Sequence, residues 1–322
     1  MKKRLLILTL SALMVIGAVG CSSKGAGEDK ATNSTKEVQQ ESKDKKISYL
    51  GKEYTVPSKD PRIVITGTME SMEDALILGV EPVGAITVGG KFPEIFKDIT
   101  DNSKPIGEKM QPNIETILSL KPDIILGSTK FPAEALEKLN KVKDTAPVSH
   151  ISTDWEANLM LMAEISGKED KAKEIIQKYK DDAKEAKEKL SDKMKDKKVV
   201  SIRIRNGNIA IYPETVFFNP VLYNDLGLTV PEQIKAAKAQ EIVSLEKFSE
   251  LNPDYIFLQF SESENADKPK ALEELKKNPI WNSINAVKND KVFVNTVDPL
   301  AQGGTAWSKS NFLKAAVAEL SK

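Results

Sequence analysis

The chain has 322 residues, and its 47 lysine and arginine residues are balanced by 47 aspartate and glutamate residues, so the formal net charge is zero. This balance argues against nucleic acid as a partner, because nucleic-acid-binding proteins carry a clear excess of basic residues. A single cysteine excludes an intrachain disulfide, so the fold must depend on a packed core.

The N-terminal residues are typical of an exported lipoprotein. Basic residues at 2–4 precede an apolar stretch at 5–19 that is short for a membrane span, and small residues then lead into Cys21. This pattern resembles the lipobox of bacterial lipoproteins. We therefore expect 1–20 to be a lipoprotein signal peptide that is cleaved before a lipidated Cys21. The alternative is an ordinary secretory signal with an incidental cysteine.

Residues 21–45 are rich in serine, lysine, glutamate and glycine and contain almost no apolar residues. Such a segment cannot bury enough apolar surface to fold. We expect a flexible tether with a reach of roughly 25–30 Å, which would hold a folded domain beside the membrane.

Residues 46–167 are expected to form a first α/β lobe. After a hairpin at 47–56, apolar runs of strand length alternate with helical segments, which is typical of parallel βαβ units. The predicted elements are strands at 62–66, 83–86 and 147–151, a helix at 71–78, and a helix end followed by a strand within 118–126.

Residues 168–194 predict one long helix. They contain no glycine or proline, and their apolar residues form a single stripe at helical spacing. The opposite face is densely charged, with Glu174 four residues before Lys178 in the favourable order for an ion pair. We interpret this helix as a rigid strut between two lobes; the alternative is a surface helix of one large domain.

Residues 195–322 repeat the α/β pattern and are expected to form a second lobe. The predicted elements are strands at 199–205, 255–259 and 291–294, and helices at 217–226 and 312–320.

Two segments, 114–126 and 245–258, look like copies of one unit. Each is predicted to be a short helix, a Leu-x-Pro-Asp turn and an apolar strand. The copies align Glu115 with Glu246. A unit of this kind in each half predicts two similar lobes, and therefore a cleft in which a ligand can lie.

The predicted ligand site follows from the rule that α/β sheets bind ligands at the carboxyl ends of their strands. Arg203 and Arg205 share one face near the end of the strand at 199–205. Two such arginines near a buried strand end need an anion; the alternative is two surface arginines on an edge strand.

Three lysines complete the predicted cationic cleft. Lys130 follows the strand of the first repeat, and Lys109 and Lys238 precede the two repeated helices. Any one of these lysines could simply be solvated surface, but together the five cations come from both lobes and imply a strongly anionic ligand.

Missing motifs narrow the function further. His150 is the only histidine, which disfavours direct capture of zinc or manganese. We find no nucleophile elbow, phosphate-binding loop or catalytic histidine pairing. We therefore expect no catalytic residues, no protein-bound metal and no enzymatic activity.

The lipobox, the two lobes, the linking helix and the cationic cleft together resemble the iron-siderophore substrate-binding lipoproteins of ABC importers. Within that family the chain is similar to members that bind ferric bacillibactin. The segments that carry this similarity are Gly107-Glu108-Lys109-Met110, Ser128-Thr129-Lys130-Phe131-Pro132, Ile202-Arg203-Ile204-Arg205, Ala236-Ala237-Lys238-Ala239-Gln240 and the run from Asp298 to Trp307.

The resemblance implies a class III periplasmic-binding-protein-like fold, with α/β lobes around central parallel sheets joined by one rigid helix. It also implies roles for particular residues. A basic triad of Lys109, Lys130 and Lys238 would engage a trianionic ferric tris-catecholate. Supporting contacts would come from Arg203, Arg205, Gln240 and, with a shorter side chain than the usual glutamine, Asn206.

The resemblance also implies partners. Glu115 and Glu246 would meet arginines on an ABC permease, and the lipid on Cys21 would hold the protein, expected to be a monomer, on the outer face of the cell membrane. Iron would stay caged in the siderophore, so no cofactor of the protein is expected. The alternatives are a receptor for a ferric hydroxamate, haem or cobalamin, and a surface siderophore hydrolase.

Overall fold

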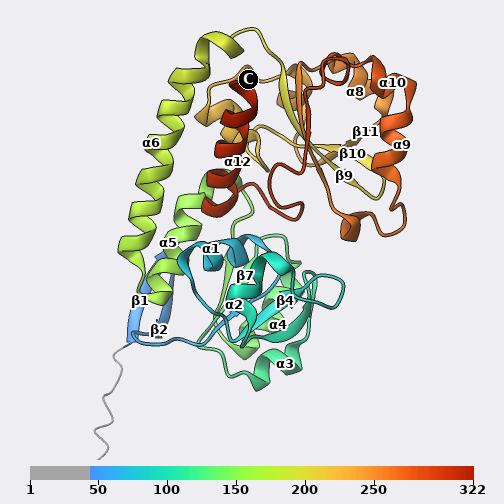
Figure 1. The fold of residues 1–322 in the computed structure, drawn as a ribbon. Helices are drawn as coiled ribbons and strands as arrows, with labels where there is room; N and C mark the ends of the chain where they lie inside the picture. The colour runs from blue at the N-terminus through green and yellow to red at the C-terminus, as the bar shows by residue number, and fades with distance from the viewer. Residues whose placement is uncertain (1–43) are drawn as a thin grey trace, which may run out of the picture. The chain divides into compact units, whose positions relative to one another are not determined.

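Two β-sheets organise residues 44–322, the part of the chain that the computed structural model describes (Figure 1). The fold class predicted from the sequence, α/β with two sheet-containing halves and a long helix, is confirmed. Residues 1–43, which include Cys21 and nearly all of the expected tether, lie outside the described residues.

The first sheet has strand order β6-β5-β4-β3-β7-β8, and all its pairings are parallel except that of β5 with β6. A separate antiparallel hairpin, β1-β2, precedes it as predicted and packs against α5. The elements of this half are β1 Asp44–Tyr49, β2 Lys52–Pro57, β3 Ile63–Ile65, α1 Glu70–Leu78, β4 Gly84–Thr87, α2 Lys97–Thr100, β5 Lys104–Glu108, β6 Gln111–Pro112, α3 Ile114–Ser119, β7 Ile124–Ser128, α4 Ala133–Val142, β8 Thr145–Val148 and α5 Trp155–Ser166, with 3₁₀ turns at Glu94–Phe96 and Ser152–Asp154.

The second sheet has strand order β11-β10-β9-β12-β13 and is mixed, not parallel throughout. The chain turns back at Asn206-Gly207, so β10 runs antiparallel to β9, and β11 runs antiparallel to β10. The elements are β9 Val199–Arg205, β10 Asn208–Ile211, α7 Glu232–Ala236, β11 Glu241–Val243, α8 Leu245–Leu251, β12 Tyr255–Phe260, α9 Ala271–Lys277, α10 Pro279–Ser283, α11 Asn285–Lys288, β13 Val292–Val294 and α12 Ala306–Leu320, with a π-helix at Pro220–Asp225 and a 3₁₀ turn at Glu262–Asn265.

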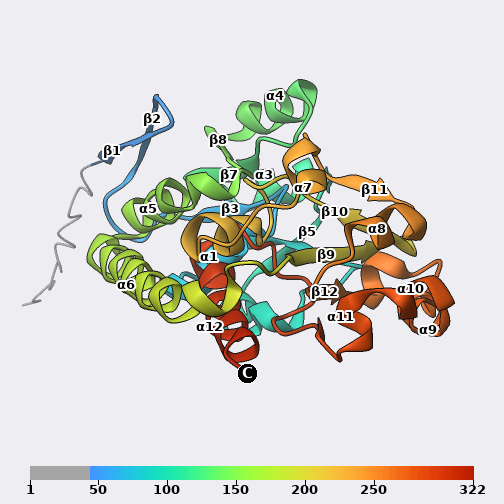
Figure 2. The same cartoon turned by 90° about the horizontal axis from the view of Figure 1, so that it is seen from above.

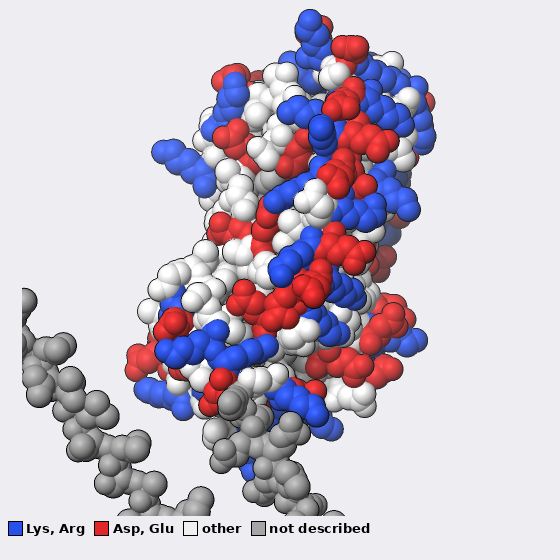
Figure 3. All heavy atoms as spheres, turned by 90° about the vertical axis from the view of Figure 1, so that its left-hand side faces the viewer, with Lys and Arg blue, Asp and Glu red and all other residues white. Residues whose placement is uncertain are grey.

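The helix α6, Glu169–Met194, follows the first half and precedes the second. Its apolar stripe packs against α5 and α12, while lysine, glutamate and aspartate side chains crowd its outer face (Figure 3). The ion pair expected between Glu174 and Lys178 is wrong in detail, because Lys178 pairs with Asp182 instead, at 2.8 Å.

Three predicted elements differ clearly from the structure, beyond small shifts at the ends of others. The strand expected at 147–151 ends at Val148. The helix expected at 217–226 is the shorter π-helix. The final helix starts at Ala306, where Thr305 caps it by accepting a hydrogen bond from the backbone N–H of Ser308. This helix, α12, lies beside α6 in both views and also packs against α1 of the first half (Figures 1 and 2).

The repeated unit is confirmed in each half. Asn113 caps α3 and Ser244 caps α8, each by accepting a hydrogen bond from a backbone N–H in the first turn. Just before each Pro-Asp pair, Lys121 and Asn252 adopt the left-handed conformation, with φ of 47° and 44°. The two turns therefore share their backbone geometry as well as their sequence.

Side chains tie the two units to their sheets in the same way. The carboxylates of Asp123 and Asp254 accept hydrogen bonds from the backbone N–H groups of Arg62 and Lys198, at 2.8 and 2.9 Å. Each of these cations in turn donates to the leucine carbonyl at the end of the repeated helix. The repeat thus places β7 and β12 beside β3 and β9, which fixes where the carboxyl ends of the central strands meet.

Candidate functional site

A cavity of about 510 Å³ lies at the carboxyl ends of the central strands and draws its lining from both halves of the chain. Among its lining residues are five of the predicted ligand-binding residues: Lys130, Arg203, Arg205, Lys238 and Gln240. The other lining residues are Glu70, His150, Ile151, Tyr212, Pro213, Thr215, Val216, Phe217, Ala239 and Gln302.

Arg203 is held from several sides and is only 2% exposed. Its Nε and Nη2 atoms donate to Oε1 of Gln259, at 3.1 and 2.6 Å, and Nη2 also donates to the backbone carbonyl of Ala301. The guanidinium lies over the ring of Phe217, 4.7 Å from its centroid. Arg203 is therefore fixed in position before any ligand arrives.

Arg205 bridges a second amide and a carboxylate. Its Nη1 atom donates to Oε1 of Gln240 and its Nη2 atom to Oε1 of Glu264, both at 2.7 Å. The same oxygen of Glu264 is 3.6 Å from Nη1 of Arg203. The chain itself therefore supplies one negative charge, the carboxylate of Glu264, beside these two arginines. This acid was not among the residues predicted from the sequence.

The two guanidinium groups keep Glu264 charged. Burial alone would raise the pKa of Glu264, but Arg203 and Arg205 outweigh burial and hold that pKa below its ordinary value.

The first half of the chain shows a matching arrangement at Lys130. Its ammonium group is 3.0 Å from Oε1 of Glu70, a residue of the first turn of α1. The Glu70 side chain is 7% exposed and that of Lys130 is 44% exposed, so the lysine faces the cavity over a nearly buried carboxylate.

Lys109 sits in the turn between β5 and β6 and is not among the residues that line the cavity. Its electrostatic neighbours nevertheless come from both halves. Burial lowers the pKa of Lys109, while Glu264 and Glu70 partly offset that effect and Arg203 and Arg205 add to it. The structure therefore brings Lys109 close to the same charged cluster.

Asn206, like Lys109, is a predicted ligand-binding residue that does not line the cavity. It is exposed, with φ of 47°, and together with Gly207, whose φ is 75°, it forms the turn between β9 and β10. An Asn-Gly pair with both φ values positive is the usual two-residue hairpin turn. The backbone N–H of Asn206 donates to the carbonyl of Glu264, so this residue helps to hold a neighbour of the cavity.

Glu115 and Glu246 both lie in the first turn of their helices, α3 and α8, and both are exposed. They are equivalent positions of the two repeated units.

Sequence reasoning missed Glu70 and Glu264, as well as the aromatic and amide residues Tyr212, Phe217 and Gln302. Both glutamates closely follow central strands, β3 and β12. The rule that found Lys130, a polar residue just past a strand end, would have found them had it been applied to acids as well as to bases.

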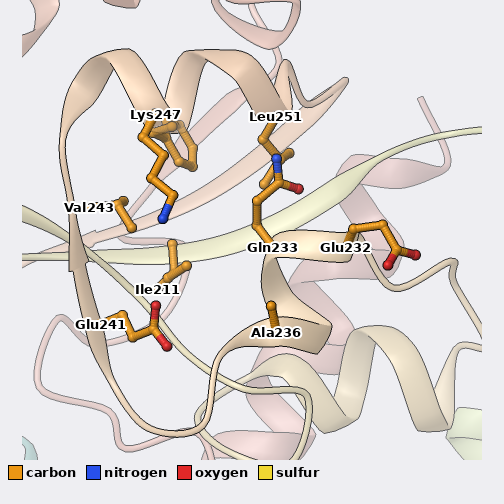
Figure 4. A pocket seen from close by; sticks show the side chains of 9 residues that line it. Ile211, Glu232, Gln233, Ala236, Glu241, Val243, Lys247 and Leu251 are labelled. Carbon is orange, nitrogen blue, oxygen red and sulfur yellow. The ribbon is translucent and has the colours of Figure 1, made fainter.

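Another cavity, of about 370 Å³, lies between α7 and α8 of the second half (Figure 4). Its floor is apolar, and its charged residues are Lys247, Glu232 and Glu241. It takes residues from one sheet only and carries one cation against two carboxylates, so it does not suit a strongly anionic ligand.

A buried carboxylate, Glu73, links α1 to the segment that leads into α12. It accepts hydrogen bonds from the backbone N–H of Gln302 at 2.8 Å, from the hydroxyl of Ser308 at 2.5 Å and from the hydroxyl of Thr305. Burial is the main cause that raises the pKa of Glu73 to about 7, although these hydrogen bonds lower it. Burial also raises the pKa of its neighbour Asp74.

We expect Glu73→Gln to stabilise the protein at pH 8 by roughly 2–3 kcal/mol and to flatten the pH dependence of its stability. Between pH 4.5 and about 7 the folded chain holds a proton on Glu73 that the unfolded chain has released, so stability falls as pH rises through this window. Urea unfolding at pH 5 to 8 measures the effect. Glu188→Gln, an exposed change on α6, is the control, and equal pH slopes in the two variants would contradict the expectation.

In the part of the chain that the structure describes, no helix is both long and apolar enough to cross a membrane. Within the same residues, no three histidine, cysteine, aspartate or glutamate side chains are grouped so that they could hold a metal ion.

Comparison with known proteins places these features in context. A family model described as periplasmic binding protein matches residues 64–298. The chain is 56% identical over 320 residues, 99% of each chain, to the iron-uptake system-binding protein of Bacillus subtilis. It is 28% identical, over 98% of this chain and 95% of the other, to a probable siderophore-binding lipoprotein of the same organism.

A solved structure is similar to this chain in both fold and sequence. The crystal structure of the triscatecholate siderophore binding protein FeuA from Bacillus subtilis, complexed with ferri-bacillibactin, matches with a TM-score of 0.83 and 62% identity. The match covers 86% of this chain and 98% of that one.

Proposed function

The chain belongs to the periplasmic binding protein family, and we propose that it is the receptor that binds a ferric tris-catecholate siderophore and delivers it to an ABC importer. The family resemblance seen in the sequence is thereby confirmed. The observation that supports the ligand assignment best is the cavity at the strand ends, where basic side chains from both halves converge.

The charge of the site suits this ligand. Three catecholate dianions around Fe³⁺ make a trianion with aromatic faces. Among the described residues, four basic side chains line the cavity, Lys130, Lys238, Arg203 and Arg205, and Lys109 lies close to the same charged cluster. The carboxylates paired with these cations are those of Glu70 and Glu264. Five positive and two negative groups leave a formal charge of plus three. Ammonium groups can also lie over catecholate rings.

The siderophore supplies all the ligands of its iron, so the protein needs none of its own. We therefore propose that the protein has no cofactor and no catalytic residues, and that it acts as a binding protein and not as an enzyme. A ferric hydroxamate carries little or no negative charge, so the basic residues of the cavity would attract it only weakly.

The remaining roles follow from the resemblance and are part of the proposal. Lipid on Cys21 would anchor the protein to the outer face of the cell membrane, with the chain acting as a monomer. Glu115 and Glu246, exposed at equivalent positions of the two repeats, would pair with arginines on the permease.

Tryptophan fluorescence tests the ligand assignment. Trp155, Trp281 and Trp307 provide the signal, and the purified chain is titrated first with a ferric tris-catecholate and then with a ferric trihydroxamate. We expect quenching by the catecholate at much lower concentration than by the hydroxamate. Binding of the hydroxamate alone would overturn the proposal, and turnover of the loaded siderophore by the purified protein would show an enzyme.

A further inference from the structure

Each half of the chain places one acidic side chain beside the cations of the cavity: Glu70 lines the cavity, and Glu264, which does not line it, pairs with Arg205. The two halves arrange acid and cation in opposite order. In the first half Glu70 follows β3 and the cation Lys130 follows the next central strand, β7. In the second half two cations, Arg203 and Arg205, are on β9, and Glu264 follows the neighbouring strand, β12. The cations at the strand ends are therefore each accompanied by an acid, and the positive charge of the cavity is partly offset in both halves.

Both acids act on the cations that would meet a ligand. Glu70 lies 3.0 Å from the ammonium of Lys130, and Glu264 lies 2.7 Å from the guanidinium of Arg205. Both also act on Lys109, where they oppose the fall of its pKa that burial causes. Their side chains are 7% and 14% exposed, so solvent and salt screen their charges weakly.

The pair of Glu264 and Arg205 is not completed within the described residues. Oε2 of Glu264 and Nε of Arg205 are both buried and have no hydrogen-bond partner there. A buried ion pair that serves stability alone requires its remaining polar atoms to be satisfied. The pair therefore lacks part of the hydrogen bonding that would make it strongly stabilising, while its effect on the charge beside the cavity remains.

We propose that Glu70 and Glu264 are specificity-determining residues that lower the charge of the cavity from plus five to plus three, and so set how strongly it distinguishes ligands by charge. This inference rests on the proposed function. With both acids present, the charge of the cavity balances a trianion. Without them the cavity would hold any multivalent anion more tightly and release it more slowly.

The test uses one tris-catecholate siderophore loaded with two metals. With Ga³⁺ the complex is a trianion, and with Ti⁴⁺ it is a dianion of closely similar shape. Dissociation constants and dissociation rates of both complexes are measured for the wild-type chain, for Glu70→Gln and for Glu264→Gln. Glu134→Gln, an exposed change on α4 with the same effect on net charge, is the control.

We expect each cavity variant to bind the trianion more tightly, and to increase its preference for the trianion over the dianion by roughly three- to tenfold. The control should keep the wild-type ratio. If the two acids have a purely structural role, the variants should bind both complexes more weakly, with an unchanged ratio between trianion and dianion. That result would overturn the inference and leave the proposed function intact.

The outcomes separate the two proposals. If the wild-type chain binds neither complex, both fail. Should either cavity variant not fold, as judged by circular dichroism, the other variant decides the question alone, because the two acids lie in different halves of the chain and pair with different cations.

Discussion

Replacing Lys109, Lys130 and Lys238 together by glutamine should weaken binding of a ferric tris-catecholate by at least about a thousandfold. Each lysine removed takes away one unit charge that faces a trianion. At short range and partial burial, each such attraction contributes about 1.4 kcal/mol or more, which is about tenfold in affinity. The fold should survive, because none of the three is fully buried.

The single variants should differ in a definite order. Lys130 shares its charge with Glu70 before the ligand arrives, so Lys130→Gln should cost less binding than Lys109→Gln, whose ammonium is more buried and lies among charges from both halves. Fluorescence titration at two salt concentrations measures each loss.

A matched control separates local from global electrostatics. Changing Lys141, Lys193 and Lys288 to glutamine alters the net charge by the same amount at exposed positions outside the cavity lining. We expect that variant to bind within a factor of about two of the wild type. Equal losses in the two triple variants would mean that the general field of the protein, and not the cavity, attracts the ligand.

The repeated unit shows why much of the fold could be predicted from the sequence. A helix cap, a left-handed residue before a proline and an aspartate that holds the next strand are all local features, and each has a residue signature. Once two copies are recognised, the places where strands end in each half follow. This is why the sequence predicts that Lys130, Arg203, Arg205 and Lys238 lie at one cleft, and the structure has all four in the lining of one cavity.

The second sheet was predicted less well because Asn206, part of a hairpin turn, was interpreted as a ligand-binding residue. Asn206-Gly207, between two apolar runs, is the strongest short hairpin signal in the chain, and the structure has a hairpin there. Without this turn, the sequence analysis did not predict the antiparallel strand β10 that follows it. The π-helix after it has no sequence signature that separates it from an ordinary helix.

The acids of the cavity could not be assigned from the sequence for a different reason. Glu70 and Glu264 are two of 47 acidic residues, and what marks them is that they lie beside particular cations. That proximity depends on the packing of segments about 60 residues apart. Sequence spacing indicates which residues lie near strand ends, but not which of them pair.

Gly303→Ala should destabilise the folded chain by about 3–5 kcal/mol, the largest expected effect of a single substitution on stability. A Cβ atom at position 303 would lie 2.4 Å from the backbone carbonyl carbon of Phe217 and 2.8 Å from the nitrogen of Phe218. Backbone atoms cannot swing aside as a side chain can. The φ of 84° at Gly303 adds the cost of a left-handed conformation for alanine.

Gly51→Ala is the matched control, because Gly51 has nearly the same φ, 82°, and no atom within 4 Å of the added Cβ. We expect it to cost about 1–2 kcal/mol, the conformational part alone. The difference between the two variants in urea unfolding isolates the clash, and similar losses would contradict the close packing at Gly303. Because Phe217 lies under Arg203, and the carbonyl of Ala301 accepts from the same arginine, Gly303→Ala should also weaken ligand binding, whereas Gly51→Ala should not.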